Sequence, residues 1–185
     1  YFLVLIEVFS KLWYNYYGDK MQELNNININ EKICKILQNK NYTFEYSYTS
    51  NNVDDTFLLA KTFAKYLQNS DIIVLNGELG SGKTVFMQGI AKYFKIENQI
   101  SSPTFTIVNE YILKNNDKIF HFDVYRLEDS TDFLDSIGTE YFQNGICVIE
   151  WGNIIQDILP KNTIFIDIQK DDKNYDKRYF KIWRK

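Results

Sequence analysis

Cysteine, proline and histidine are scarce in this sequence of 185 residues, which holds two cysteines, two prolines and one histidine. The cysteines, Cys34 and Cys147, are far apart, and there is no Cys-x-x-Cys pair or Cys/His cluster. Neither a zinc site nor a disulfide framework is therefore expected. Cys147 lies in an apolar, strand-like run and is expected in the core. This cysteine usage favours a reducing, cytoplasmic location.

The sequence also lacks a long basic run. It contains 21 Lys and Arg against 24 Asp and Glu, a formal net charge of −3. A protein that grips a nucleic-acid backbone by itself usually carries a basic patch. Autonomous RNA binding is therefore not expected, although RNA could still be the substrate of a partner. Aromatic residues reach 17%; they could stack on bases, but most fall within apolar strand or helix patterns, which favours core packing.

No apolar run is long enough to cross a bilayer, which takes about 20 residues. The apolar stretch Tyr1–Val8 is too short, and no positively charged segment precedes it, so it makes a poor signal peptide. No membrane association is expected. Because the first methionine is Met21, residues 1–20 are expected to be a non-native or upstream extension. Residues 21–42 form an N-terminal lead-in, weakly ordered or helical, and residues 43–185 form one domain of ordinary size.

Hydrophobic periodicity divides this domain into strands and helices. A helix capped by Ser50 or Asn52 is expected to run to Leu67, and a second helix spans residues 85–94. Short helices are expected over residues 132–137, 140–142 and 154–159, the last ending at Pro160. Strands are expected over residues 43–48, 71–76, 104–113, 118–125, 145–150, 163–168 and 178–183.

Between the strand at 71–76 and the following helix lies GELGSGKT, a full match to GxxxxGK[ST]. Glycines let the backbone turn tightly, and the exposed N–H groups at the helix start can face a phosphate. Lys83 would meet the β- and γ-phosphates, and the hydroxyl of Thr84 would bind Mg²⁺. The alternative is a glycine-rich turn that matches by chance, which the strand–loop–helix context disfavours. The loop residues expected to bind the nucleotide are Gly77, Gly80, Ser81, Gly82, Lys83 and Thr84.

This loop, together with the order of elements, predicts an α/β fold. We expect a P-loop NTPase-like three-layer architecture with a mixed, mainly parallel central sheet. The sheet would be parallel near the loop and partly antiparallel elsewhere.

A P-loop enzyme needs a second acid for the metal, commonly at the end of a neighbouring apolar strand. Glu150 ends GICVIE and is the candidate, the alternative being an exposed acid at a strand end. Asp123, in HFDVYRL, could orient water near the γ-phosphate, and alternation places His121 and Tyr125 on its face. Arg126 could neutralise charge or pair with an acid. A lone histidine such as His121 is more often structural than catalytic.

Ser102, Pro103 and Thr104 precede the predicted hairpin. Hydroxyls in such a segment can contact the γ-phosphate and report its presence, as switch segments do. The plain alternative is a turn at a strand entrance, which Pro103 also favours.

Four motifs occur in one order: GELGSGKT at 77–84, SPTFTIVNEY at 102–111, HFDVYRL at 121–127 and IEWG at 149–152. This series closely resembles the TsaE family over residues 43–185. The resemblance implies a Mg²⁺-dependent ATPase, with ATP and Mg²⁺ as cofactors, that works with TsaD and TsaB. In that system TsaD transfers threonylcarbamoyl to the adenosine 3′ of the anticodon in tRNAs that read codons beginning with A. The TsaE-like subunit does not perform the transfer, and its ATP hydrolysis supports turnover by resetting the complex.

The resemblance also assigns roles to individual residues. Lys83 grips the phosphates, Thr84 and Glu150 hold the metal, and Asp123 is tied to hydrolysis. Ser102 and Thr104 fall in the switch-like segment. Trp151 matches the family's aromatic residue next to the metal-linked acid, and Thr56 is the choice for an adenine contact within residues 48–56. The catalytic set is therefore Lys83, Asp123 and Glu150.

Two other functions stay open. A small P-loop kinase would need an acceptor pocket and usually a basic lid, and neither is evident in the sequence. A nucleotide-controlled binding module would bind without hydrolysis. A GTPase is disfavoured because no NKxD motif follows the loop; the NKN at 39–41 lies upstream.

Overall fold

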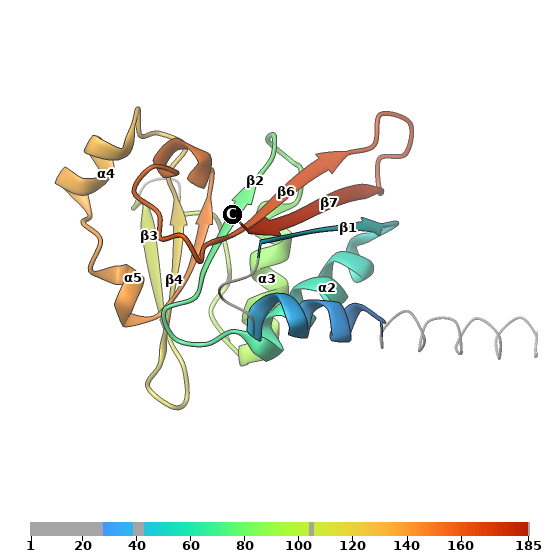
Figure 1. The fold of residues 1–185 in the computed structure, drawn as a ribbon, viewed down its shortest axis with the longest axis horizontal. Helices are drawn as coiled ribbons and strands as arrows, with labels where there is room; N and C mark the ends of the chain where they lie inside the picture. Colours follow the sequence, from blue (N-terminus) through green and yellow to red (C-terminus); the bar gives the residue numbers. More distant parts are fainter. Residues whose placement is uncertain (1–27, 39–42, 104–105, 185) are drawn as a thin grey trace, which may run out of the picture.

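The computed structural model describes residues 28–38, 43–103 and 106–184. A seven-stranded mixed sheet runs through the molecule, with helices on both of its faces (Figure 1). The expected extension at residues 1–20 and the candidate Thr104 lie outside the described residues.

The sheet has the strand order β1-β7-β6-β2-β5-β4-β3. Its four middle strands, β6, β2, β5 and β4, are parallel to one another, whereas β3 pairs with β4, β7 with β6 and β1 with β7 in antiparallel fashion. The expected mixed sheet, parallel around the loop-bearing strand, is confirmed. The strands are β1 (Phe44–Ser50), β2 (Ile72–Asn76), β3 (Val108–Ile112), β4 (Lys118–Asp123), β5 (Ile146–Glu150), β6 (Ile164–Lys170) and β7 (Arg178–Arg184).

Strands β2 and β5 lie in the middle because their side chains are apolar on both faces. Along β2, Ile73 and Leu75 enter one hydrophobic core, and Ile72 and Val74 enter the other. Cys147 on β5 is fully buried, as its apolar run predicted. A strand covered on both faces is the usual setting of parallel pairing.

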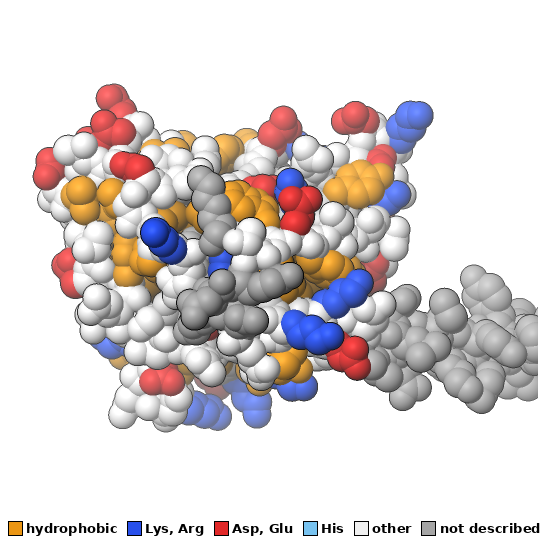
Figure 2. Space-filling model, viewed as in Figure 1, with side chains coloured by type: hydrophobic (Ala, Val, Ile, Leu, Met, Phe, Trp, Pro, Cys, Tyr) orange, Lys and Arg blue, Asp and Glu red, His pale blue; other side chains and the backbone are white. Residues whose placement is uncertain are grey.

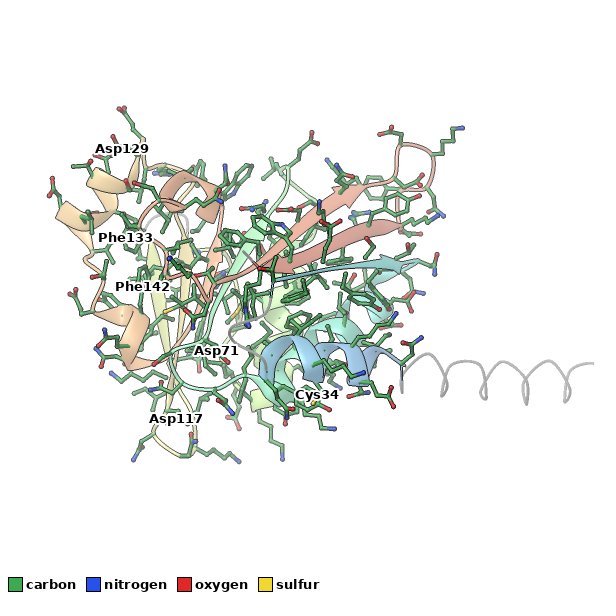
Figure 3. The ribbon with its side chains drawn as sticks, in the orientation of Figure 1. Cys34, Asp71, Asp117, Asp129, Phe133 and Phe142 are labelled. Atoms are coloured by element: carbon green, nitrogen blue, oxygen red, sulfur yellow. The ribbon has the colours of Figure 1, made fainter. Side chains whose placement is uncertain are left out.

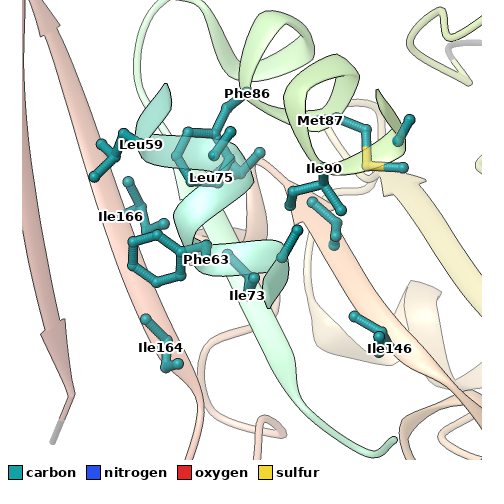
Figure 4. Packing of buried hydrophobic residues seen from close by; sticks show 14 of the residues in the cluster. Leu59, Phe63, Ile73, Leu75, Phe86, Met87, Ile90, Ile146, Ile164 and Ile166 are labelled. Carbon is teal, nitrogen blue, oxygen red and sulfur yellow. The ribbon is translucent and has the colours of Figure 1, made fainter. Parts of the chain in front are cut away.

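Helices α2 (Val53–Tyr66) and α3 (Lys83–Phe94) cover one face of the sheet (Figure 4). Asn52 caps α2 by accepting a hydrogen bond from the Asp55 N–H at 2.9 Å, one of the two predicted caps. The helices approach closely at Gly89, where an added Cβ would lie 2.5 Å from the Cβ of Ala60. This close contact packs the middle of α3 against α2.

The opposite face carries α4 (Ser130–Ser136), α5 (Tyr141–Asn144) and the 3₁₀ turn η1 (Gly152–Ile155). Phe133 of α4 and Phe142 of α5 stack with their ring centroids 5.8 Å apart, and both are labelled in Figure 3. They belong to the second core, with Val74 and Ile149 of the sheet. Two helical layers therefore enclose the sheet, and the predicted three-layer α/β fold is confirmed.

Residues 28–38, within the predicted lead-in, are helical. Ile29, Ile33, Ile36 and Leu37 are buried in the same core as α2 and α3. The Lys32 ammonium lies 4.8 Å from the centre of the Tyr46 ring on β1. This part of the lead-in thus packs on the domain, while the boundaries placed at residues 20 and 42 stay predictions.

Three predicted elements differ in the structure from their prediction in bounds or in type. Strand β3 begins at Val108, because Ile107 adopts a φ of 64° and its N–H bonds to the Pro103 carbonyl in a turn. Strand β4 ends at Asp123 rather than residue 125. The helix predicted at 154–159 is instead η1 followed by turns, held by i to i+3 bonds such as Ile154 N–H to Trp151 O.

No helix in the described ranges is long and apolar enough to cross a membrane. On the face shown in Figure 2, the Lys and Arg side chains of the described residues are scattered among uncharged and acidic ones.

Candidate nucleotide-binding site

The predicted site residues meet at the carboxyl-terminal edge of the parallel strands. Strand β2 runs directly into the loop at Gly77, β5 ends at Glu150 and β4 ends at Asp123. Glu150 is in register with Leu75 on one side and Asp123 on the other. Ligands of open α/β sheets bind outside this edge, so the topology itself brings the loop and the two acids together.

The loop's shape depends on its glycines. Gly77, Gly80 and Gly82 have φ values of 147°, 75° and 109°, which L side chains rarely adopt. At Gly77 a Cβ would also lie 2.5 Å from the Ile168 carbonyl oxygen of β6. No described residue fills the corresponding space around Gly80 and Gly82, so a ligand can approach the backbone there.

Lys83, the first residue of α3, is 5% exposed and points back over the loop. Its ammonium donates to the carbonyls of Gly77 at 2.7 Å and Glu78 at 3.0 Å, and lies 4.0 Å from the centre of the Trp151 ring. Burial lowers the pKa of Lys83, and the nearby Glu150 and Asp123 carboxylates partly oppose that shift. An ammonium has three N–H donors, so one is left for a phosphate oxygen.

Glu150 is almost fully buried and accepts two hydrogen bonds on one oxygen. The Thr84 hydroxyl donates to its Oε1 at 3.0 Å, and Nε2 of His121 also lies 3.0 Å from Oε1. Glu150 is thus not the exposed strand-end acid of the alternative interpretation. It is joined directly to the loop hydroxyl that was predicted to hold the metal.

Asp123 forms the second half of the site. Ser102 donates its hydroxyl to Oδ2, and the Tyr125 N–H donates to Oδ1 at 3.3 Å. The segment before β3 therefore reaches the site through Ser102. Alternation had predicted that Tyr125 shares the strand face of Asp123. This prediction is wrong, because β4 ends at Asp123 and the chain turns at Tyr125.

A cavity of about 470 Å³ joins these groups. Trp151 lines it from the turn after β5, with a left-handed φ of 65° that bends the chain beside the loop. Thr56 does not line it: the residue is buried at the start of α2, with its hydroxyl 2.9 Å from that of Ser50. Arg126 does not line it either, and its Nε donates to the Tyr125 hydroxyl at 2.8 Å. The predicted residues that line the cavity are Gly80, Gly82, Lys83, Thr84, Ser102, Asp123, Glu150 and Trp151.

Two cations from the β6–β7 hairpin hold the outer side of the loop, and sequence reasoning had missed both. Arg178 donates from Nε to the Ser81 carbonyl at 2.9 Å and from a terminal nitrogen to the Gly80 carbonyl at 3.3 Å. Lys170 donates to the Leu79 carbonyl at 3.0 Å. In a trans peptide the N–H points opposite to the carbonyl. The N–H groups of Gly80 and Gly82 therefore point away from the hairpin, as phosphate binding requires.

We expect Arg178→Gln to weaken ATP binding by about tenfold, because loss of a charge-assisted hydrogen bond costs roughly 1.5–3 kcal/mol. Lys181→Ala is the control, since Lys181 lies on the same strand and pairs with Glu45 at the surface, at 3.0 Å. Titration of a fluorescent ATP analogue would compare the two variants. Unchanged affinity in Arg178→Gln would contradict a role for the hairpin in shaping the loop.

A second cavity, of about 730 Å³, opens on the other side of the loop. Gly77, Glu78 and Ser81 of the loop line it together with residues of the hairpin such as Asp171 and Asp172. The Ser81 hydroxyl is buried and has no hydrogen-bond partner among the described residues. A cavity therefore lies on each side of the loop.

The comparisons with known proteins agree on one family. The family model "Threonylcarbamoyl adenosine biosynthesis protein TsaE" matches residues 50–180. The TsaE protein of Bacillus subtilis is 38% identical over 123 residues, covering 64% of this chain and 74% of its own length. That of Aquifex aeolicus is 38% identical over 134 residues, covering 71% and 91%.

A solved structure agrees with these sequences. The crystal structure of Bacillus subtilis YdiB aligns with a TM-score of 0.63 at 30% identity, over 77% of this chain and 87% of that one. The range matched by the family model includes the loop at 77–84, Asp123, Glu150 and Arg178. The chain belongs to the TsaE family of threonylcarbamoyladenosine biosynthesis proteins.

Proposed function

We propose that this protein is a Mg²⁺-dependent ATPase that supports turnover of a TsaD- and TsaB-like transferase in tRNA threonylcarbamoyladenosine modification. The observation that carries the proposal is the single cavity shared by Lys83, Thr84, Asp123 and Glu150. A loop that presents N–H groups and an ammonium suits a polyphosphate, and the two carboxylates beside it suit metal-assisted hydrolysis.

The residues present fit Mg²⁺ bound together with a nucleotide. Thr84 and Glu150 offer hard oxygen atoms, the ligand type that Mg²⁺ prefers. Among the described residues there is no group of three or more His, Cys, Asp or Glu side chains that could hold a metal ion. Phosphate oxygens and water would therefore complete the coordination. When bound, Mg²⁺ would neutralise charge on the phosphates.

For hydrolysis, the chain's own groups divide into two roles. Lys83 would place positive charge against the terminal phosphates, where negative charge develops. The Asp123 carboxylate, lining the same cavity, would accept a hydrogen bond from the attacking water and orient it. Ser102 donates to that carboxylate, so the segment before β3 could respond to the state of the γ-phosphate.

The nucleoside would extend from the loop toward the hairpin cavity. Asp171 and Asp172 there could accept hydrogen bonds from an amino group or from ribose hydroxyls. Thr56 lines neither cavity, so an adenine contact from this residue would require movement at the start of α2. ATP is preferred over GTP in this proposal because the sequence has no guanine-reading motif.

The partners would be TsaD-like and TsaB-like proteins in the cytoplasm, with tRNA reached only through the complex. The net charge of −3 supports this indirect contact with tRNA.

Reconstitution tests the proposal. We expect slow ATP hydrolysis by the protein alone and faster hydrolysis with TsaD- and TsaB-like proteins, together with repeated cycles of tRNA modification. Phosphate release and modified adenosine would be measured in the same reaction. Equal ATP turnover with and without partners would contradict the proposal. A phosphorylated small molecule would favour a kinase, and nucleotide binding without phosphate release would favour a binding module.

A further inference from the structure

The only histidine of the chain, His121, sits in the middle of the site although it does not line the cavity. It belongs to β4, two residues before Asp123, and its side chain is fully buried. Its Nε2 lies 3.0 Å from Oε1 of Glu150, the same oxygen that accepts the Thr84 hydroxyl. One carboxylate oxygen therefore connects β4, β5 and the loop.

Chemistry decides the direction of this bond. An ionised carboxylate oxygen can only accept, so Nε2 of His121 must carry the proton. The other ring nitrogen, Nδ1, is buried and has no partner among the described residues. A buried polar ring with one unsatisfied nitrogen is costly, and an apolar side chain would fill the same space without that cost. The bond to Glu150 is the polar contact that accounts for a histidine here.

We infer that His121 is a positioning residue that holds the Glu150 carboxylate in the orientation needed for Mg²⁺; this inference rests on the proposed function. Two donors on Oε1 fix the rotamer of a side chain that otherwise has three free torsions. They leave Oε2 without a hydrogen bond from the described residues. Loss of a hydrogen-bond partner that orients a metal ligand typically lowers metal affinity by about 10- to 100-fold.

Two amide substitutions of His121 separate positioning from packing. The amide nitrogen of Gln can take the place of Nε2 and still donate to Glu150, whereas the shorter Asn amide reaches only the place of Nδ1. Both variants bury a similar polar group. We expect His121→Asn to raise the Mg²⁺ concentration that half-saturates the ATP complex by roughly 10- to 100-fold. In His121→Gln it should stay close to that of the unchanged protein.

The readout is ATP binding, measured by calorimetry across a Mg²⁺ series and in EDTA, so that no activity is needed. Binding of ATP in EDTA should be equal in all variants, because the loop amides and Lys83 are untouched. Val148→Ala controls for lost packing, since Val148 faces His121 in the β4–β5 register. Its Mg²⁺ dependence should not change.

A double variant tests whether the effect passes through Glu150. In a Glu150→Gln background, His121→Asn should cause no further change in Mg²⁺ dependence. The inference is overturned if His121→Asn and His121→Gln show the same Mg²⁺ dependence of ATP binding, or if Val148→Ala matches His121→Asn. It is also overturned if the effects of His121→Asn and Glu150→Gln on that dependence simply add in the double variant. If instead the unchanged protein binds ATP with no Mg²⁺ dependence, the proposed function fails first, and the two failures are distinguishable.

Discussion

Lys83→Ala should lower the affinity for ATP by about 100-fold, the upper end expected when a charge-assisted hydrogen bond to phosphate is lost. The ammonium sits over the loop, held by the Gly77 and Glu78 carbonyls. The nearby cation Lys170 is not placed to replace it, because its ammonium bonds the outer side of the loop, at the Leu79 carbonyl. Calorimetric titration of ATP at millimolar Mg²⁺ measures the change.

The loss of binding should not come from unfolding. Lys83 is a buried cation whose pKa is lowered by its burial, so removing it also removes a desolvated charge. The thermal midpoint of Lys83→Ala should therefore stay near that of the unchanged protein. Lys92→Ala is the matched control, because Lys92 is an exposed residue in the last turn of the same helix. If both variants bound ATP equally well, the loop could not be the phosphate site.

Asp123→Asn should reduce the rate of ATP hydrolysis by about 100- to 1000-fold while leaving the affinity for Mg²⁺ and ATP within a few-fold. The substitution keeps the shape of the side chain but replaces the carboxylate, which would accept a hydrogen bond from the attacking water, by a neutral amide. Loss of a positioned general base typically costs 10²–10⁴ in rate. Phosphate release under single-turnover conditions, in the presence of the partner proteins, isolates this step.

Asp117→Asn serves as the control for Asp123→Asn, since Asp117 lies at the turn between β3 and β4, away from the cavity (Figure 3). It should hydrolyse ATP at the unchanged rate. Hydrolysis at that same rate by Asp123→Asn would show that Asp123 only anchors Ser102 and takes no part in orienting water.

The parts of this site that the sequence predicts are those attached to the ends of strands. Lys83 and Thr84 begin α3, just after the loop that leaves β2, and Glu150 and Asp123 end β5 and β4. Parallel strands deliver their carboxyl ends to one edge, so a correct strand assignment suffices to bring these residues together. The same local patterns predicted a cap at Ser50 or Asn52, of which Asn52 is the cap in the structure, and the two buried central strands.

Contacts between distant segments could not be predicted in this way. Arg178 bonds the carbonyl of Ser81, 97 positions earlier in the chain, and this contact depends on the hairpin folding over the loop. The bond between His121 and Glu150 depends on the register of β4 with β5. Alternation along β4 placed His121 and Asp123 on one face but extended the strand two residues too far, because nothing in the pattern marks where the strand gives way to the turn at Tyr125.

The central claim is that the loop at 77–84 binds ATP in a Mg²⁺-dependent manner. Calorimetric titration of ATP into the full chain, with millimolar Mg²⁺ and again with EDTA, tests it most directly. We predict saturable binding that is tighter with Mg²⁺, because Thr84 and Glu150 then contribute. The absence of binding heat under both conditions, with the protein folded, would contradict the account.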